Sequence, residues 1–341
     1  MKALILNGPC NLAFEDTPDA PLAPAEVRVR TLYSGISAGT ELTQYRGTSP
    51  FMNRQWDEAR RLFVPGGASW SYPIRNLGYE EAGEIVELGS AVTGLRVGQR
   101  IYGAWHHRSH HIADQDWARD RLMPEGLDPR AGIFSHIGAV ALNGVHDARI
   151  RIGDVVAVFG LGVPGQIVAQ AARASGATVI TVDPDAQRRG LALKFGAKHA
   201  IPPENAAETI KELTQNRGAD ACIEVSGAAP ALSEAIRAVA YSSRVVAMGF
   251  FQGELSGIRL GDEFHHNRVE LVCSQISGTA PEAQHRWSKP RLWRTAIELQ
   301  AAGVLDLIPL ITDPVPFAEA PTLFARLDRG ALGVMQSVLE F

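Results

Sequence analysis

Cysteine is scarce in this sequence, and long apolar runs are missing. Only Cys10, Cys222 and Cys273 occur among 341 residues, far apart from one another. Three separated cysteines exclude a disulfide framework and a thiolate metal cluster, which favours a reducing compartment, the cytoplasm. No apolar stretch reaches the length of a membrane span, and the N-terminal residues lack the layout of a signal peptide. We therefore expect a protein that works without a membrane and is not secreted.

An excess of positive charge is also missing. The chain has 33 Lys and Arg against 37 Asp and Glu, a net charge of -4 at pH 7. This balance argues against a nucleic acid or an anionic membrane as the partner. Hydrophobic residues make up 45% and charged residues 21%, which is typical of a globular enzyme with a small-molecule substrate. The length allows two domains.

Glycine, by contrast, is frequent, and three glycines form the strongest motif. The apolar run Val155–Phe159 predicts a buried parallel strand, and Gly160, Gly162 and Gly165 follow it as G-x-G-x-x-G. In order, they permit a tight turn, the approach of a pyrophosphate to the backbone, and close packing of the next helix. The N-terminus of that helix attracts the anion. Asp183 ends the next predicted strand and is positioned to accept both ribose hydroxyls of an adenosine, so the pattern predicts a dinucleotide site.

Further cofactor contacts are expected within the turn and after later strands. Val163 and Pro164 complete the glycine-rich turn. Ser226 and Gly249 each follow a strand expected in the same sheet, and we predict that they line the cofactor site.

Asp183 also bears on the choice of dinucleotide. Its carboxylate would repel a 2′-phosphate, which favours NAD over NADP. Arg188 lies nearby and is predicted to contact the cofactor, and with Arg189 it keeps NADP open as the less favoured outcome.

The order of predicted elements divides the chain into two fold types. The N-terminal third reads as short strands between Pro- and Gly-rich turns. Strands and helices alternate from about 136 to 279, which predicts a doubly wound parallel sheet of Rossmann type. We therefore expect an α/β protein with a β-rich domain, 1–135 and 280–341, and a dinucleotide-binding domain, 136–279.

An insertion at 49–76 interrupts the β-rich part. Residues 53–63 have a helical pattern, and a Pro- and Gly-rich stretch follows. This segment is interpreted either as a lid or as a surface decoration.

The whole chain resembles the medium-chain dehydrogenase/reductase superfamily, which includes zinc alcohol and polyol dehydrogenases. The resemblance implies a GroES-like catalytic domain beside the Rossmann domain. The matching segments are SGISAGTE at 34–41, YRG at 45–47, GYEEAGEI at 78–85, VGQRI at 97–101 and IGD at 152–154.

The residues expected to bind zinc in this family are largely replaced. The resemblance puts Ala38, or Ser37 with a shift of one, at the position of a Cys ligand. Tyr79 stands at the position of a His ligand, and the third position falls near Ser135 or His136. Zinc requires thiolate, imidazole or carboxylate donors. The resemblance therefore implies a zinc-independent member.

Without a metal, another group must stabilise the oxygen that gains or loses charge during hydride transfer. Tyr79 is the first candidate, because its phenol can donate a proton. Alternatively, Tyr79 only fills the space that the metal and its ligand would occupy. Thr40 matches the family's Ser/Thr that hydrogen-bonds the substrate oxygen, and Glu41 matches an acidic position that orients the site.

A histidine-rich run, 106–111, offers other acid/base candidates. On a strand, His107, Ser109 and His111 would share one face, and His107 or His111 would then reach the cleft. An atypical metal site and a merely polar, partly exposed strand are the alternatives. His136 is a further candidate.

Three functions fit these features. The first is an NAD-dependent dehydrogenase or ketoreductase of a secondary alcohol, such as a polyol or a sugar-like compound. The second is a zinc-free NAD(P)H-dependent quinone or enoyl reductase, and the third is a nucleotide-binding redox sensor without turnover. The apolar run Val269–Ile276 would lie at a sheet edge, which predicts a homodimer or homotetramer.

Overall fold

The computed structural model describes residues 1–341, which form two compact units. The first unit is Met1–His136 with Ile308–Phe341, and the second unit is Ile137–Leu307. The expected domain boundary near residue 136 lies at the boundary of these units. The segment 280–307, expected in the β-rich domain, is instead part of the second unit.

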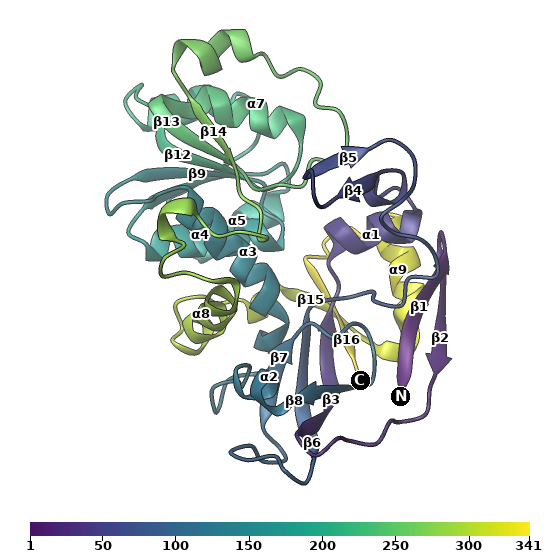
Figure 1. The fold of residues 1–341 in the computed structure, drawn as a ribbon. Helices are drawn as coiled ribbons and strands as arrows, with labels where there is room; N and C mark the ends of the chain where they lie inside the picture. The colour runs from purple at the N-terminus through teal and green to yellow at the C-terminus, as the bar shows by residue number, and fades with distance from the viewer. The chain divides into compact units, whose positions relative to one another are not determined.

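A six-stranded parallel sheet forms the centre of the second unit (Figure 1). All five strand pairs are parallel, and the order β11-β10-β9-β12-β13-β14 is that of a doubly wound sheet. This confirms the predicted Rossmann architecture. The strands are β9 (Val155–Phe159), β10 (Thr178–Val182), β11 (His199–Ile201), β12 (Ala219–Glu224), β13 (Val239–Ala247) and β14 (Glu270–Cys273).

Helices cover both faces of this sheet because its central strands are apolar along their whole length. The four residues 156–159 of β9 are each at most 1% exposed. In Figure 1, α7 lies above the strands, and α4 and α5 lie below them. The helices of the second unit are α3 (Phe134–Asp147, from residue 137 on), α4 (Val163–Ala174), α5 (Ala186–Lys194), α6 (Ala206–Leu213), α7 (Ala229–Ala238) and α8 (Lys289–Ala301).

Close packing explains why α8 belongs to the second unit. A Cβ atom at Gly138 in α3 would lie only 2.7 Å from the Cβ of Ala296 in α8, so the two helices are in direct contact. The Gln170 side chain of α4 holds both the N–H and the C=O of Asp306. Neither contact has a signature in the local sequence pattern.

The first unit is built on an antiparallel sheet with one parallel pair. Its strand order is β15-β16-β3-β6-β7, and β8 pairs with residues 26–30 of β3, beyond the end of β16. The strands β1 and β2 form a separate hairpin. The strands are β1 (Lys2–Gly8), β2 (Asn11–Asp16), β3 (Glu26–Gly35), β6 (Glu81–Leu88), β7 (Arg100–Gly103), β8 (His110–Asp114), β15 (Ile311–Pro316) and β16 (Gln336–Glu340). The helices are α1 (Ala38–Arg46), α2 (Gln115–Arg119) and α9 (Ala320–Asp328).

The insertion forms a hairpin, so the predicted helix at 53–63 is wrong. The strands β4 (Gln55–Asp57) and β5 (Leu62–Val64) pair with Trp56 opposite Phe63. Asp57 fixes the turn by accepting from the N–H of Arg60, and Arg61 adopts a left-handed backbone conformation. The aromatic side chains that mimic a helical stripe pack across the hairpin instead.

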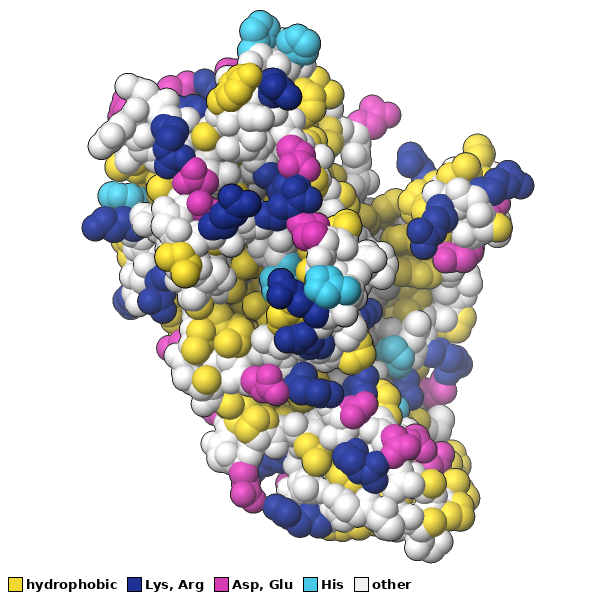
Figure 2. Space-filling view, turned by 60° about the vertical axis from the view of Figure 1, so that its left-hand side comes forward, with side chains coloured by type: hydrophobic (Ala, Val, Ile, Leu, Met, Phe, Trp, Pro, Cys, Tyr) yellow, Lys and Arg dark blue, Asp and Glu magenta, His cyan; other side chains and the backbone are white.

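Neither unit contains a helix with the length and hydropathy of a membrane span. Figure 2 shows cationic and anionic side chains interspersed over the face that it draws, in keeping with the small net charge.

Candidate active site

The glycine-rich turn of the second unit has the geometry of an anion cradle. Gly160 has φ of +94°, a conformation that L side chains rarely adopt. A Cβ at Gly165 would lie 1.9 Å from the carbonyl oxygen of Gly160, so no side chain fits there. Helix α4 starts at Val163 with Gly162 as its N-cap and Pro164 in the first turn. The first N–H groups of α4 have no intrahelical partner, and together with the helix dipole they favour an anion at this N-terminus.

Asp183 lies against this turn. Its Oδ2 accepts a 2.7 Å hydrogen bond from the N–H of Leu161, and its Oδ1 accepts from the N–H of Asp185 at 2.8 Å. Each oxygen keeps a lone pair for a ribose hydroxyl. Arg189 donates to the carbonyls of residues 183 and 184, while the Arg188 guanidinium lies 4.0 Å from Asp185.

Glu224 organises the neighbouring turn, and sequence reasoning missed it. Its carboxylate, at the end of β12, accepts from the N–H and hydroxyl of Ser226 and from the N–H of Gly227. A Cβ at Gly249 would lie 2.6 Å from this carboxylate and 2.2 Å from the nitrogen of Gly227. Ser226 and Gly249 are therefore brought together at the carboxyl ends of β12 and β13. An acid at the end of an apolar strand, two residues before Ser-Gly, is the signal that would have found Glu224.

Tyr79 meets the start of α1 in the first unit. Its phenol donates a short hydrogen bond to the Ser37 hydroxyl and also hydrogen-bonds the Thr40 side chain. The ring edge lies against His136, with the ring centroids 5.0 Å apart. Glu41 caps the same helix, because its Oε1 accepts from the N–H of Ser37 at 2.8 Å. The structure thus brings Tyr79, Thr40, Ser37 and His136 together.

Behind these residues lies a buried network that joins α1, β3 and β6 through one imidazole. His107 Nε2 is 2.7 Å from Glu41 Oε2, and His107 Nδ1 is 2.7 Å from Ser34 Oγ. The Ser34 hydroxyl donates to Glu81, which also accepts from the N–H of Trp105. All of these side chains are buried. Ser34 and Glu81 were missed in the sequence, although they lie directly opposite each other in the β3–β6 register.

The position of Tyr79 depends on this imidazole. A Cβ at Gly78 would lie 2.6 Å from the His107 ring, and Gly78 has φ of +91°. Only glycine allows the chain to pass His107 and deliver Tyr79 to α1. Because both ring nitrogens of His107 are engaged, this residue positions its neighbours and does not face a substrate.

Burial and carboxylate neighbours control protonation in this site. Burial, followed by the charges of Glu80 and Glu41, raises the pKa of Tyr79 above its ordinary value. Burial also raises the pKa of Glu80, whose Oε2 has no hydrogen-bond partner, and that of Glu81 to about 7. Burial alone would lower the pKa of His107, but Glu41 and then Glu81 raise it.

His111 lies outside the network around His107, although the sequence predicted that the two histidines share one face of a strand. His106 has φ of +71° and β8 begins only at His110, so residues 106–111 are not one strand. His111 pairs with Val29 and stacks on Trp105, with ring planes 4° apart. Val29 and Ser34 are five residue steps apart along β3, or roughly 17 Å. Burial lowers the pKa of His111 to about 4, so its imidazole is neutral at neutral pH.

The side chains at the expected metal position do not fit zinc. Ser37, Thr40 and Tyr79 offer neutral hydroxyls, and His136 is the one imidazole among them. Nowhere in the chain do three or more His, Cys, Asp or Glu side chains converge as a metal site.

Comparison with known proteins identifies the family. Residues 23–149 match the family model described as "Alcohol dehydrogenase GroES-like domain", and residues 164–291 match "Zinc-binding dehydrogenase". The chain is 33% identical over 335 residues to D-guloside 3-dehydrogenase of Escherichia coli K12, covering 96% of this chain and 95% of the relative. This chain belongs to the medium-chain dehydrogenase/reductase superfamily.

Other members of the superfamily agree with this result. Sorbitol dehydrogenase of Halalkalibacterium halodurans is 26% identical, with 97% of both chains covered. A Sinorhizobium meliloti dehydrogenase structure bound to NADP has a TM-score of 0.78 at 23% identity, covering 100% of this chain and 99% of that one. The chain is accordingly an oxidoreductase that acts on alcohols.

We expect stability to decline as pH rises through 7, because Glu81 is protonated in the folded protein and ionised in the unfolded one. A folded-state pKa raised to about 7 stabilises the protein below the unfolded value, and this contribution is lost above pH 7. The free energy of unfolding should fall by about 1 kcal/mol more between pH 6 and pH 8 in the wild type than in Glu81→Gln. Urea denaturation at both pH values measures it. Glu84→Gln, on the same strand, is the control, and equal slopes for wild type and Glu81→Gln would contradict the argument.

Proposed function

We infer that this protein transfers a hydride between NAD and a secondary alcohol or ketone of a polyol or sugar-like substrate, without a catalytic zinc. The observation that carries this inference is the pairing of Tyr79 with Ser37 at the start of α1, where the family's metal donors are expected. The dehydrogenases of D-guloside and sorbitol among its relatives support a substrate with several hydroxyl groups. They also favour an enzyme over a redox sensor without turnover.

The cofactor is held, in this proposal, by Gly160, Gly162, Val163, Pro164 and Gly165 of the turn. Asp183 would bind the adenosine ribose, with Arg188, Ser226 and Gly249 around the same edge of the sheet. Bound there, the nicotinamide supplies or accepts the hydride. The close backbone approach at Gly165 supports this assignment, because it holds the N-terminus of α4, which favours an anion, against the end of β9.

The proton in the proposed reaction comes from Tyr79. During ketone reduction the carbonyl oxygen gains negative charge, and a phenol within hydrogen-bond distance can donate its proton to it. Thr40 holds the same oxygen. Glu41 and His107 act as positioning residues, since their polar atoms are engaged with Ser37 N–H and Ser34. The positive end of the α1 dipole favours negative charge developing beside Ser37.

A quinone or enoyl reductase is the second candidate function. The side chains beside Tyr79 are hydroxyls and an imidazole, which suit a hydroxylated substrate better than a planar apolar one. Oxidation of NADH with a ketone of a polyol and with a quinone distinguishes the two functions, since only one of these substrate classes should support turnover.

The proton donor is tested by Tyr79→Phe, which should slow single-turnover ketone reduction by roughly a hundredfold or more while NADH affinity stays unchanged. Since the pKa of Tyr79 is raised by burial, the wild-type rate should be flat from pH 6 to pH 8. The measurement is stopped-flow oxidation of NADH with the ketones of sorbitol, 2,3-butanediol and methyl glycosides.

Tyr45→Phe is the matched control, because it removes another phenol from the same unit. A rate that fell through pH 6 to 7 would point to a histidine donor instead. Stoichiometric zinc after dialysis, with activity lost on chelation, would refute the metal-free proposal.

NADH should bind at least about tenfold more tightly than NADPH, because the Asp183 carboxylate repels a 2′-phosphate. Asp183→Asn keeps the shape and, through its single carbonyl oxygen, one of the two backbone contacts, but it removes the charge, so it should weaken this preference. Isothermal titration calorimetry with both reduced cofactors measures the effect. Asp185→Asn, two residues away at the N-cap of α5, should leave the preference unchanged. Tighter binding of NADPH by the wild type would refute the assignment to NAD.

A homodimer or homotetramer is proposed from the edge strand β14. It pairs with β13 alone, and Leu271 on it is 39% exposed. Unpaired apolar edges are normally covered. Light scattering should give at least twice the monomer mass of 36.8 kDa, and Leu271→Lys should shift the protein toward monomer. Leu213→Lys, on α6 with similar exposure, should not. A monomeric wild type at micromolar concentration would contradict the proposal.

A further inference from the structure

A second pocket of the second unit is lined by arginines and lies apart from the glycine-rich turn. Its volume is about 480 Å³, within the range of small-molecule sites. Helix α4 begins at the turn and ends beside Ser175, which lines the pocket. The twelve residues of α4 span about 18 Å, so the two sites are at opposite ends of this helix.

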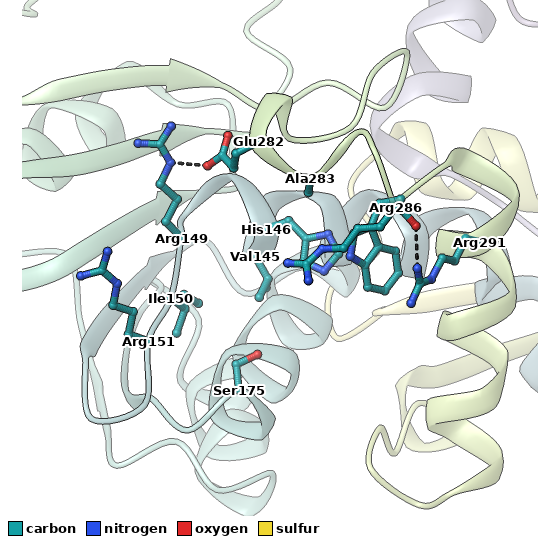
Figure 3. Close-up of a pocket in the computed structure, with 11 residues that line it drawn as sticks. Val145, His146, Arg149, Ile150, Arg151, Ser175, Glu282, Ala283, Arg286 and Arg291 are labelled. Carbon is teal, nitrogen blue, oxygen red and sulfur yellow. Dashed lines mark hydrogen bonds and ion pairs between the residues drawn. The ribbon is translucent and has the colours of Figure 1, made fainter.

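Four arginines from separate parts of the chain line this pocket. Arg149 and Arg151 come from the loop between α3 and β9, Arg286 precedes α8, and Arg291 lies in α8. In Figure 3 the first two lie on one side of the pocket and the last two on the other. The only carboxylate of the lining is Glu282, which pairs with Arg149.

The charges of the lining do not cancel. Four guanidinium groups against one carboxylate leave three positive charges among the lining residues. The C-termini of α3 and α4 point to this region and contribute about half a negative charge each. A net charge of roughly +2 remains in the pocket. Glu270 and Asp147 also act on Arg149, so the charge of Arg149 is compensated. Arg151 and Arg286 form no ion pair, and Arg291 donates to the carbonyl of Arg286.

The remaining lining is preorganised and has an unused polar atom. Trp287 is held between neighbours, since its ring centroid is 4.4 Å from that of His146 and 4.1 Å from the Arg291 guanidinium carbon. His146 Nδ1 is buried without a hydrogen-bond partner. One tautomer of this imidazole donates from Nδ1, so an acceptor in the pocket would satisfy it.

We propose that this pocket binds a small molecule through a phosphate or diphosphate group, held by Arg151, Arg286 and Arg291. Guanidinium groups bind such oxyanions with paired, charge-assisted hydrogen bonds. The ligand occupies this site together with the dinucleotide, because α4 separates the two. The proposal does not depend on the substrate or on the metal-free chemistry.

The test is calorimetric titration with pyrophosphate, on protein saturated with whichever reduced cofactor binds more tightly. The cofactor occupies the glycine-rich turn, so pyrophosphate heat then reports the second pocket. Arg151→Ala and Arg286→Ala should each weaken pyrophosphate binding about tenfold. Arg294→Ala removes an exposed arginine of α8 outside the pocket and should change binding less than twofold.

Three results would overturn the proposal. The first is no pyrophosphate heat on the cofactor-saturated wild type at millimolar concentration. The second is an equal loss in Arg294→Ala, which would mean non-specific attraction to positive charge. The third is dissociation of an oligomer in Arg151→Ala or Arg286→Ala by light scattering, which would assign the pocket to a contact between subunits. Unchanged melting temperatures of the variants establish that they are folded.

Discussion

The imidazole of His107 is the constraint on which the geometry of the first unit depends. It is buried between Glu41 and Ser34, and through Ser34 it reaches Glu81. Removing one member of such a network leaves a buried charge or polar group without a partner, which is costly. The network therefore fixes α1, β3 and β6 together, and the ring leaves room only for a glycine at position 78.

Tyr79 is the consequence of that arrangement. The chain passes His107 at Gly78 and delivers the phenol to the hydroxyls of Ser37 and Thr40. Polar side chains therefore still meet at the start of α1, but they carry hydroxyl groups where the family is expected to have metal ligands. Burial raises the pKa of the phenol, which keeps it in the protonated form that donates to an oxygen.

The second unit is constrained by a different contact, the approach of Gly165 to the carbonyl oxygen of Gly160. No side chain fits between the strand end and the helix, so the helix N-terminus is held against β9. Asp183 ties the end of β10 to the same turn through the N–H of Leu161. The first contact is made by backbone alone, and the second joins a backbone N–H to the Asp183 side chain.

The sequence by itself determined the superfamily, the parallel sheet and the glycine-rich turn, because these depend on local patterns: apolar runs, turn glycines and an acid at a strand end. It also pointed to Tyr79, Thr40 and Glu41 as candidate site residues. Only the tertiary structure decided the rest. The separation of His107 from His111, the pairing of Ser34 with Glu81, the hairpin at Trp56 and the assignment of α8 to the second unit all depend on strand register and helix contacts. These join residues far apart in the chain, and no local pattern specifies them.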